Sequence, residues 1–142
     1  MKALILAAGM GTRISEITYS KPKCLIDIDG ETILERQVRL LKEIGVSDEN
    51  IIIVIGYQAD SIKKLIGDKV TYFYNKNYST TNSLYSMWLT RHEDFSNGML
   101  LFNSDVIFHK EILIKLISRE GNTVAIDFSK KIVKGELNVI VE

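Results

Sequence analysis

Small and cationic residues are concentrated in the first connection of the chain, within the stretch LAAGMGTRISEITYSKPKCL that runs from residue 6 to residue 25. Gly9 and Gly11 follow an apolar run, and Arg13 and Lys23 come after them. A backbone without bulky side chains lets a polyphosphate approach its N–H groups. The planar guanidinium of Arg13 adds donors that suit phosphate oxygens. The stretch therefore indicates phosphate binding.

Two familiar phosphate-binding loops are excluded. A P-loop requires Gly-Lys-Ser/Thr five residues after its first glycine, and nothing of that kind follows Gly9 or Gly11. The dinucleotide pattern G-x-G-x-x-G requires a third glycine where this chain has Ile14. On the glycines alone, a tight turn without a ligand is the simpler explanation.

The sequence indicates Asp105 as a candidate metal ligand. Asp105 follows the apolar run 99–102 after Asn103 and Ser104, and a hard cation that bridges phosphates prefers carboxylate oxygen. An aspartate in the turn that ends a strand is the alternative. Ligands of parallel sheets collect at the carboxyl ends of the strands, so the loop 7–13 and Asp105 are expected at one sheet edge.

Alternating apolar runs and amphipathic segments predict an α/β sandwich with a mostly parallel sheet between helices. Thr32 and Glu35 have the spacing of a capping box, and Gly45 stands where a helix C-terminal glycine belongs. The expected helices cover residues 32–45, 62–67, 82–91 and 111–117, and the expected strands cover residues 3–6, 51–55, 70–74, 99–102, 124–126 and 137–141.

Length and charge restrict the class of protein. The 142 residues suffice for one domain, and 18 basic residues balance 18 acidic ones. A neutral chain has no broad field that would attract nucleic acid or an anionic membrane, so a local cluster must hold any anion. The single cysteine, Cys24, excludes an internal disulfide and fits a reducing cytoplasm. The N-terminal apolar run is too short for a spanning helix or a secretory signal, and we expect it to be a buried strand.

The motifs together resemble those of the nucleotidyltransferases that activate sugar phosphates and related compounds. The family pattern L-A-A-G-x-G-x-R, followed after about ten residues by P-K-x-L, is matched here by LAAGMGTR and PKCL. The segment GETILERQV is also similar to the family, and NKNYSTTNSLYSMWL with LLFNSDVIF resembles its choline-phosphate cytidylyltransferase branch. The resemblance covers nearly the whole chain. It implies a Rossmann-like, three-layer α/β/α sandwich of the nucleotide-diphospho-sugar transferase type.

The resemblance also implies a set of site residues. Arg13 and Lys23 would stabilise charge at the reacting phosphates, and Asp105 would bind Mg²⁺. The nucleotide would contact Leu6, Ala7, Ala8, Gly9, Gly11, Thr12, Tyr57, Asn75, Asn82 and Ser83. Asn75 and Asn82 also fit the roles of a turn residue and a helix cap.

The implied reaction transfers CMP from CTP to a small phosphorylated acceptor such as phosphocholine and releases pyrophosphate. A sugar-1-phosphate uridylyl- or thymidylyltransferase is the alternative, and a non-catalytic nucleotide-binding module is the alternative from another class. Neither nucleic acid nor a membrane is an expected partner, and a homo-oligomer is one option. The expected location is the cytoplasm.

The end of the chain departs from the family. Catalytic domains of the family are longer, so residues 1–142 are expected to form an NTP-binding domain that is incomplete at its C-terminus. The missing part normally supplies a second metal-binding aspartate and much of the acceptor pocket, and the alternative is that another chain supplies this wall. We therefore expect nucleotide and Mg²⁺ binding by this chain, with slow or no catalysis by the chain alone. Trp88 shares a helical face with Leu84, which favours core packing over a cage for a quaternary ammonium group.

Overall fold

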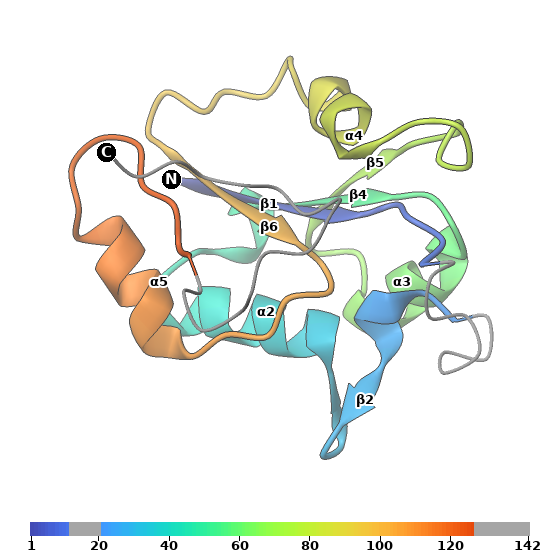
Figure 1. Ribbon diagram of the computed structural model, residues 1–142, viewed down its shortest axis with the longest axis horizontal. Coiled ribbons are helices and arrows are strands. Elements are labelled where there is room, and N and C mark those ends of the chain that lie inside the picture. The colour runs from blue at the N-terminus through green and yellow to red at the C-terminus, as the bar shows by residue number, and fades with distance from the viewer. Residues whose placement is uncertain (12–20, 127–142) are drawn as a thin grey trace. The chain divides into compact units, whose positions relative to one another are not determined.

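The computed structural model describes residues 1–11 and 21–126 of the chain. The chain divides into two compact units, Met1–Phe108 and His109–Glu142, and each is described by itself. The first unit contains every described strand and all but one of the described α-helices (Figure 1).

A parallel sheet forms the centre of the first unit. Its four strands stand in the order β5-β4-β1-β6, and every neighbouring pair is parallel. The strand bounds are Lys2–Ala7 for β1, Ile51–Ile55 for β4, Thr71–Tyr74 for β5 and Met99–Asn103 for β6. β1 lies between β4 and β6, with Ile5 opposite Ile53 on one side and Phe102 on the other. The predicted α/β fold is confirmed.

Both faces of β1 and β4 are buried, as their unbroken apolar runs predict. Leu4, Ile52 and Val54 pack with Met87 and Leu89 from one side of the sheet. The latter two belong to α4, Ser83–Leu89. Side chains alternate along a strand, so the neighbours of these sheet residues point to the opposite face. α2, Ile33–Glu43, and α3, Ala59–Ile66, cover that face, which gives three layers (Figure 1).

The capping signals of α2 are confirmed. The Thr32 hydroxyl accepts a hydrogen bond from the Glu35 N–H, and the Glu35 carboxylate accepts one from the Thr32 N–H. Leu34 and Leu41 are fully buried, and Gly45 has a φ of +91° just beyond the helix. α3 ends at Gly67, also as expected.

Short elements connect β1 to α2. η2, Lys23–Leu25, is a single 3₁₀ turn, and β2, Asp27–Ile28, pairs antiparallel with β3, Glu31–Thr32. Sequence patterns indicated only the turn at Gly30, because strands of two residues have no measurable periodicity. A further 3₁₀ turn, η3 at Asp48–Asn50, precedes β4.

The second unit contributes α5, Lys110–Ile117, close to the predicted range. The strand expected at residues 124–126 is wrong: these residues adopt no regular structure and are exposed. A strand of three residues has no stability without a partner for its N–H and C=O groups, and no described strand pairs with it. The strand expected at residues 137–141 lies outside the described residues.

The expectation that Trp88 is a core residue is also wrong. Trp88 is 50% exposed and Leu84 is 67% exposed. The indole stacks on Tyr85, with ring centroids 5.6 Å apart, and the Arg91 guanidinium lies 3.6 Å from the indole centroid. The buried side of α4 instead carries the small polar residue Ser86, and Thr90 is buried just beyond the helix end.

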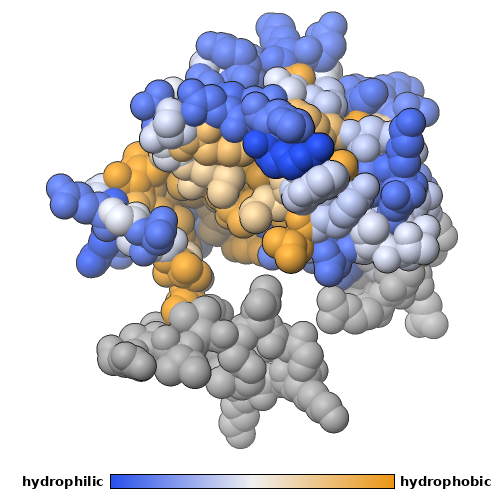
Figure 2. Space-filling model, turned by 90° about the horizontal axis from the view of Figure 1, so that it is seen from above, coloured by the Kyte–Doolittle hydropathy of each residue, from blue (hydrophilic) through white to orange (hydrophobic). Residues whose placement is uncertain are grey.

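Exposed apolar residues also occur on β6, an edge strand of the described sheet. Met99 is 39% and Leu101 is 48% exposed. The space-filling view of the molecule shows an open apolar area bordered by polar side chains (Figure 2). Within the described part of the chain, no helix is long and apolar enough to cross a membrane.

Candidate functional site

The loop that leaves β1 contains two glycines, and the structure explains the need for glycine at only one of the two positions. Gly11 has a φ of +65°, and a Cβ at this position would lie only 2.7 Å from Lys23 Cγ. Gly9 has no positive φ, and a Cβ there would meet no atom of the described residues within 4 Å. Packing and backbone conformation therefore explain Gly11, whereas nothing in the described fold requires a glycine at position 9. An open surface at Gly9 is what close approach of a ligand needs.

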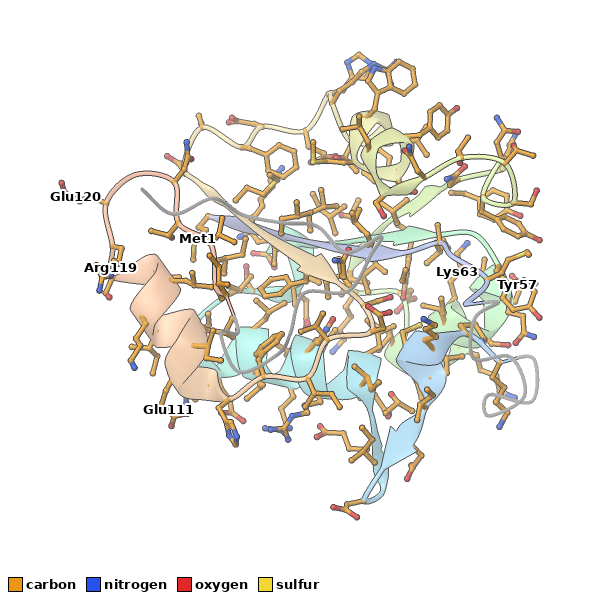
Figure 3. All side chains as sticks on the ribbon, in the orientation of Figure 1. Met1, Tyr57, Lys63, Glu111, Arg119 and Glu120 are labelled. Atoms are coloured by element: carbon orange, nitrogen blue, oxygen red, sulfur yellow. The ribbon has the colours of Figure 1, made fainter. Side chains whose placement is uncertain are left out.

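The same loop is attached to the end of β4. The Tyr57 N–H donates to the Ala8 carbonyl over 3.0 Å, and a Cβ on Gly56 would lie 2.8 Å from that oxygen and 2.7 Å from Tyr78 Cβ. Tyr57 lies at this end of the sheet, beside the loop (Figure 3). Sequence reasoning did not single out Gly56 as a site residue. The available signal was a glycine directly after a buried strand.

Lys23 and Asp105 come together at this sheet edge. Lys23 Nζ lies 3.6 Å from Asp105 Oδ2, and the two side chains are 20% and 45% exposed, respectively. The Lys23 stem passes over Gly11, so the lysine connects the glycine loop with Asp105. A pair of this exposure contributes little to stability, and its charges remain available to a ligand.

The position of Asp105 follows from the strand order. Asp105 comes just after β6, and the preceding Ser104 N–H donates to the Leu6 carbonyl of β1 over 3.3 Å. β4 and β6 flank β1 on opposite sides, so β1 and β6 form the point where the strand order reverses. Ligands of open α/β sheets bind outside the carboxyl ends of strands at such a point. Lys23, the residues of the loop that are described and Asp105 thus share the predicted edge.

Cys24 lies beneath this site and is chemically inert. It is 2% exposed, and burial raises the pKa of its thiol to about 12, although a hydrogen bond with Ser104 opposes the shift. The thiol is therefore protonated at neutral pH. It acts as a packed residue, as the sequence suggested.

Asn75 and Asn82 occupy the structural roles that the sequence left open. The Asn75 amide is buried and donates to the Thr81 and Ser86 hydroxyls, while its oxygen accepts from the Asn77 N–H. Asn82 caps α4 by accepting a hydrogen bond from the Tyr85 N–H.

The predicted contacts of this region with a nucleotide stay predictions. Asn82 and Ser83 are exposed at the N-terminus of α4, next to a shallow groove of about 360 Å³ that Asn82, Leu84, Tyr85 and Trp88 line. Tyr57 is partly buried, with its ring centroid 6.1 Å from that of Tyr78.

Two further site residues of the sequence prediction, Thr12 and Arg13, lie outside the described residues. Among the residues that are described, no three His, Cys, Asp or Glu side chains form a metal-binding group. Asp105 thus belongs to no such group within the described ranges. Mg²⁺ in nucleotide sites commonly binds one or two carboxylates together with substrate phosphates, so the donor set fits that type of site.

The fold and the site define an α/β domain with an open, glycine-containing loop and an adjacent cation–carboxylate pair at the switch point of its sheet. The model of the MobA-like NTP transferase domain matches residues 3–132. The chain belongs to this family.

Individual relatives agree with the family assignment. The chain is 38% identical over 132 residues to a choline-phosphate cytidylyltransferase of Streptococcus pneumoniae, covering 91% of this chain and 53% of the relative. A choline-phosphate cytidylyltransferase of Haemophilus influenzae is 38% identical over 117 residues, covering 80% and 48%. The chain thus spans about half the length of these curated relatives.

A solved structure is similar as well. The CTP:phosphocholine cytidylyltransferase from Streptococcus pneumoniae superposes with a TM-score of 0.62 at 37% identity. The similarity covers 73% of this chain and 44% of that one.

Proposed function

We propose that the protein is a nucleotidyltransferase that transfers CMP from CTP to a small phosphorylated alcohol of the phosphocholine type. The observation that carries the proposal is the approach of Lys23 Nζ to within 3.6 Å of Asp105 Oδ2, at the edge where the glycine loop leaves β1. A phosphate-binding cation and a metal-binding carboxylate are needed side by side in this chemistry. CTP and phosphocholine are chosen because the similar proteins are named for them.

The reaction places specific demands on the chain. A phosphate oxygen of the acceptor attacks the α-phosphorus of the triphosphate, a new P–O bond forms, and the bond to the bridging oxygen breaks, so that pyrophosphate leaves. No covalent intermediate with the protein is needed, and the protein contributes alignment and charge stabilisation. Gly9 would let the phosphates approach the backbone, and Lys23 and Arg13 would neutralise developing charge.

Asp105 is the residue that would hold Mg²⁺. The ion, when bound, would supply positive charge that neutralises the phosphates. Lys23 would then exchange its carboxylate partner for a phosphate oxygen. A lysine about 4 Å from a phosphate oxygen is worth on the order of 4 kcal/mol at an effective dielectric near 20. The ion pair thus holds Lys23 and Asp105 close together, as binding of phosphate and metal at one place would require.

The nucleoside would lie toward the β4 and β5 ends of the same edge. Leu6, Ala7 and Ala8 form the entry to the loop, and Tyr57 adjoins Ala8. The Asn75 amide is committed to its own loop, so we assign it the positioning of the turn that precedes α4. Asn82 and Ser83 remain the candidates for direct contact with ribose or base.

A panel of triphosphates and acceptors tests the proposal. Pyrophosphate release is measured with a full-length version of the protein, using CTP, UTP, dTTP and GTP against phosphocholine, aminoethylphosphonate and glucose 1-phosphate, each with Mg²⁺. We expect the highest kcat/KM with CTP and a phosphorylated alcohol. Preference for UTP or dTTP with a sugar phosphate would replace the proposal by a sugar-1-phosphate nucleotidyltransferase.

Calorimetry with CTP and Mg²⁺ addresses the rival from another class. Tight binding without turnover of any acceptor in the panel, even by a full-length version of the protein, would identify a non-catalytic nucleotide-binding module. Absence of binding by every triphosphate would exclude both forms of the proposal.

A further inference from the structure

The amide of Gln37 is a buried polar group that the site described above does not use. Gln37 lies on α2 and is 1% exposed. Its Nε2 donates to the Asn103 carbonyl over 3.0 Å and to the Val106 carbonyl over 2.7 Å. Asn103 ends β6, and Val106 immediately follows Asp105. Both hydrogens of one amide nitrogen thus bind the two sides of the turn that carries Asp105.

The direction of these bonds fixes the orientation of the amide. Both partners are carbonyl oxygens, which accept only, so the nitrogen must face the turn. The remaining oxygen, Oε1, is buried without a hydrogen-bond partner among the described residues. Burying an unpartnered amide oxygen is costly. An apolar residue would avoid this cost if packing of α2 against the sheet were the only requirement at this position.

Backbone hydrogen bonds hold the Asp105 turn as well. The Ser104 N–H donates to the Leu6 carbonyl of β1, and the Val106 N–H donates to the Asn103 carbonyl across the turn. The turn is therefore held by β1 through its backbone and by α2 through Gln37. Between these anchors, the Asp105 carboxylate is presented to Lys23.

We propose that Gln37 is a positioning residue that fixes the Asp105 turn in the geometry needed for metal and phosphate. The inference rests on the proposed function for its role in Mg²⁺ binding, whereas its structural part is independent of that function. Removal of the Gln37 amide takes one hydrogen bond from each of the two carbonyls, leaves the Asn103 carbonyl its bond from the Val106 N–H, and lets the turn rotate. The carboxylate then spends less time next to Lys23.

The test compares Gln37→Met with Thr90→Val. Methionine keeps the volume of the side chain and removes both donors. Thr90 is likewise 1% exposed, but its hydroxyl donates to the Met87 carbonyl at the end of α4. Thr90→Val therefore controls for the removal of a buried polar group away from the Asp105 turn. Gln37→Asn, whose amide is one methylene too short to reach both carbonyls, replaces the methionine variant if that variant does not fold.

Amide hydrogen exchange is the first measurement. We expect exchange of the Ser104 and Val106 amides to rise about tenfold or more in the Gln37 variant and to stay unchanged in Thr90→Val. Unchanged protection of both amides in the Gln37 variant overturns the proposal, whatever the protein binds. This result does not depend on the nucleotidyltransferase assignment.

A Mg²⁺ titration of CTP binding is the second measurement. We expect the apparent Mg²⁺ affinity to fall about tenfold in the Gln37 variant, with CTP affinity in the absence of Mg²⁺ unchanged and with wild-type behaviour in Thr90→Val. An equal loss with and without Mg²⁺, or no loss, contradicts the role in metal positioning. If the wild-type protein binds no nucleotide, the proposed function fails, and the exchange experiment alone then decides whether Gln37 fixes the turn.

Discussion

Lys23 is placed where its charge matters more for a ligand than for the fold. Its ion pair with Asp105 is long, at 3.6 Å, and half-exposed on the carboxylate side. Pairs of this kind contribute about 0–1 kcal/mol to the free energy of unfolding. An interaction with developing charge in a transition state is larger, because the donor is oriented in advance.

In a full-length, active version of the protein, Lys23→Ala should therefore lower kcat by about 10²–10³ while changing the free energy of unfolding by less than about 1 kcal/mol. Steady-state kinetics and chemical denaturation provide the two measurements. Lys42→Ala is the control, because it removes another lysine–aspartate pair, with Asp48 at 2.9 Å, far along α2. Wild-type turnover in Lys23→Ala would remove Lys23 from the mechanism.

Asp105→Ala should abolish the Mg²⁺ dependence of nucleotide binding, because it removes the carboxylate assigned to the metal. Calorimetric titration of CTP at several Mg²⁺ concentrations measures this dependence. Asp48→Ala removes a carboxylate that is also in an ion pair but lies elsewhere, and it should retain the wild-type response. An Asp105 variant that still titrates with Mg²⁺ would refute the metal assignment.

Cys24 should resist alkylation in the folded protein. Burial raises the pKa of its thiol to about 12, so at pH 8.5 almost no thiolate is present, and access is also blocked. In the unfolded chain the pKa returns to about 8.5 and the thiol reacts. In the folded state the Cys24 thiol keeps its proton up to a higher pH than in the unfolded chain. The thiol therefore contributes stability that is fully present below about pH 9 and is lost as the pH rises toward 12.

Iodoacetamide labelling at pH 8.5, followed by mass spectrometry with and without denaturant, checks the prediction for Cys24. We expect labelling only in denaturant. Labelling of the folded protein at the rate of a small free thiol would show that Cys24 is accessible and not packed as described.

At the scale of elements, the two glycines of the loop after β1 differ in role. The fold requires Gly11, whereas Gly9 would be required by a ligand. Gly11→Ala brings a Cβ to 2.7 Å from Lys23 Cγ at a φ of +65°. A left-handed conformation costs an alanine about 1–2 kcal/mol. Gly9→Ala meets neither obstacle among residues 1–11 and 21–126, because its Cβ would have none of their atoms within 4 Å.

We therefore expect Gly11→Ala to lower the free energy of unfolding by about 1–2 kcal/mol and Gly9→Ala to leave it within about 0.5 kcal/mol of wild type. Gly9→Ala should instead weaken CTP binding, since the added methyl group occupies the surface open to phosphate. Chemical denaturation and calorimetry measure both effects on each variant. A Gly9 variant with wild-type CTP affinity would contradict the placement of the phosphates on this loop.

Comparison of the predicted and observed elements shows which sequence signals were sufficient to predict a strand or a helix. The unbroken apolar runs of β1 and β4 predicted buried strands, and the Thr32–Glu35 spacing predicted the start of α2, because each signal reports a local requirement. For α4, the spacing of Leu84 and Trp88 predicted a shared face but could not tell which face is buried. The buried positions carry Ser86 and Thr90, whose hydroxyls take part in hydrogen bonds with Asn75 and Met87.

The candidate site was predictable in part for a similar reason. Parallel strands bring their carboxyl ends to one edge, so the sequence predicted that the loop 7–13 and Asp105 share that edge, whereas the 3.6 Å approach of Lys23 to Asp105 was not predicted. The contributions of Gly56 and Gln37 could not be predicted either. Their roles depend on close approach and on hydrogen bonds between elements that are far apart in the sequence, and no local pattern records either.

At the scale of the molecule, substitution of Trp88, the chain's single tryptophan, tests whether α4 presents an apolar surface. Trp88 is half-exposed, so Trp88→Ala should change the free energy of unfolding by less than about 1 kcal/mol, compared with about 3–5 kcal/mol for a tryptophan in a core. Circular dichroism during chemical denaturation is the measurement. Leu41→Ala, at a fully buried position, should cost about 2–5 kcal/mol and serves as the contrast. A core-sized loss for Trp88→Ala would restore the packing role.

The place of β1 between β4 and β6 has a consequence for refolding. β6 is the last described strand along the chain, and its pairing with β1 must close a long loop, which is the slow kind of contact to form. Until that pairing exists, Asp105 and the glycine loop are apart and no binding surface is present. A nucleotide held by both would thus slow unfolding without accelerating refolding, so added CTP would shift only one arm of the chevron.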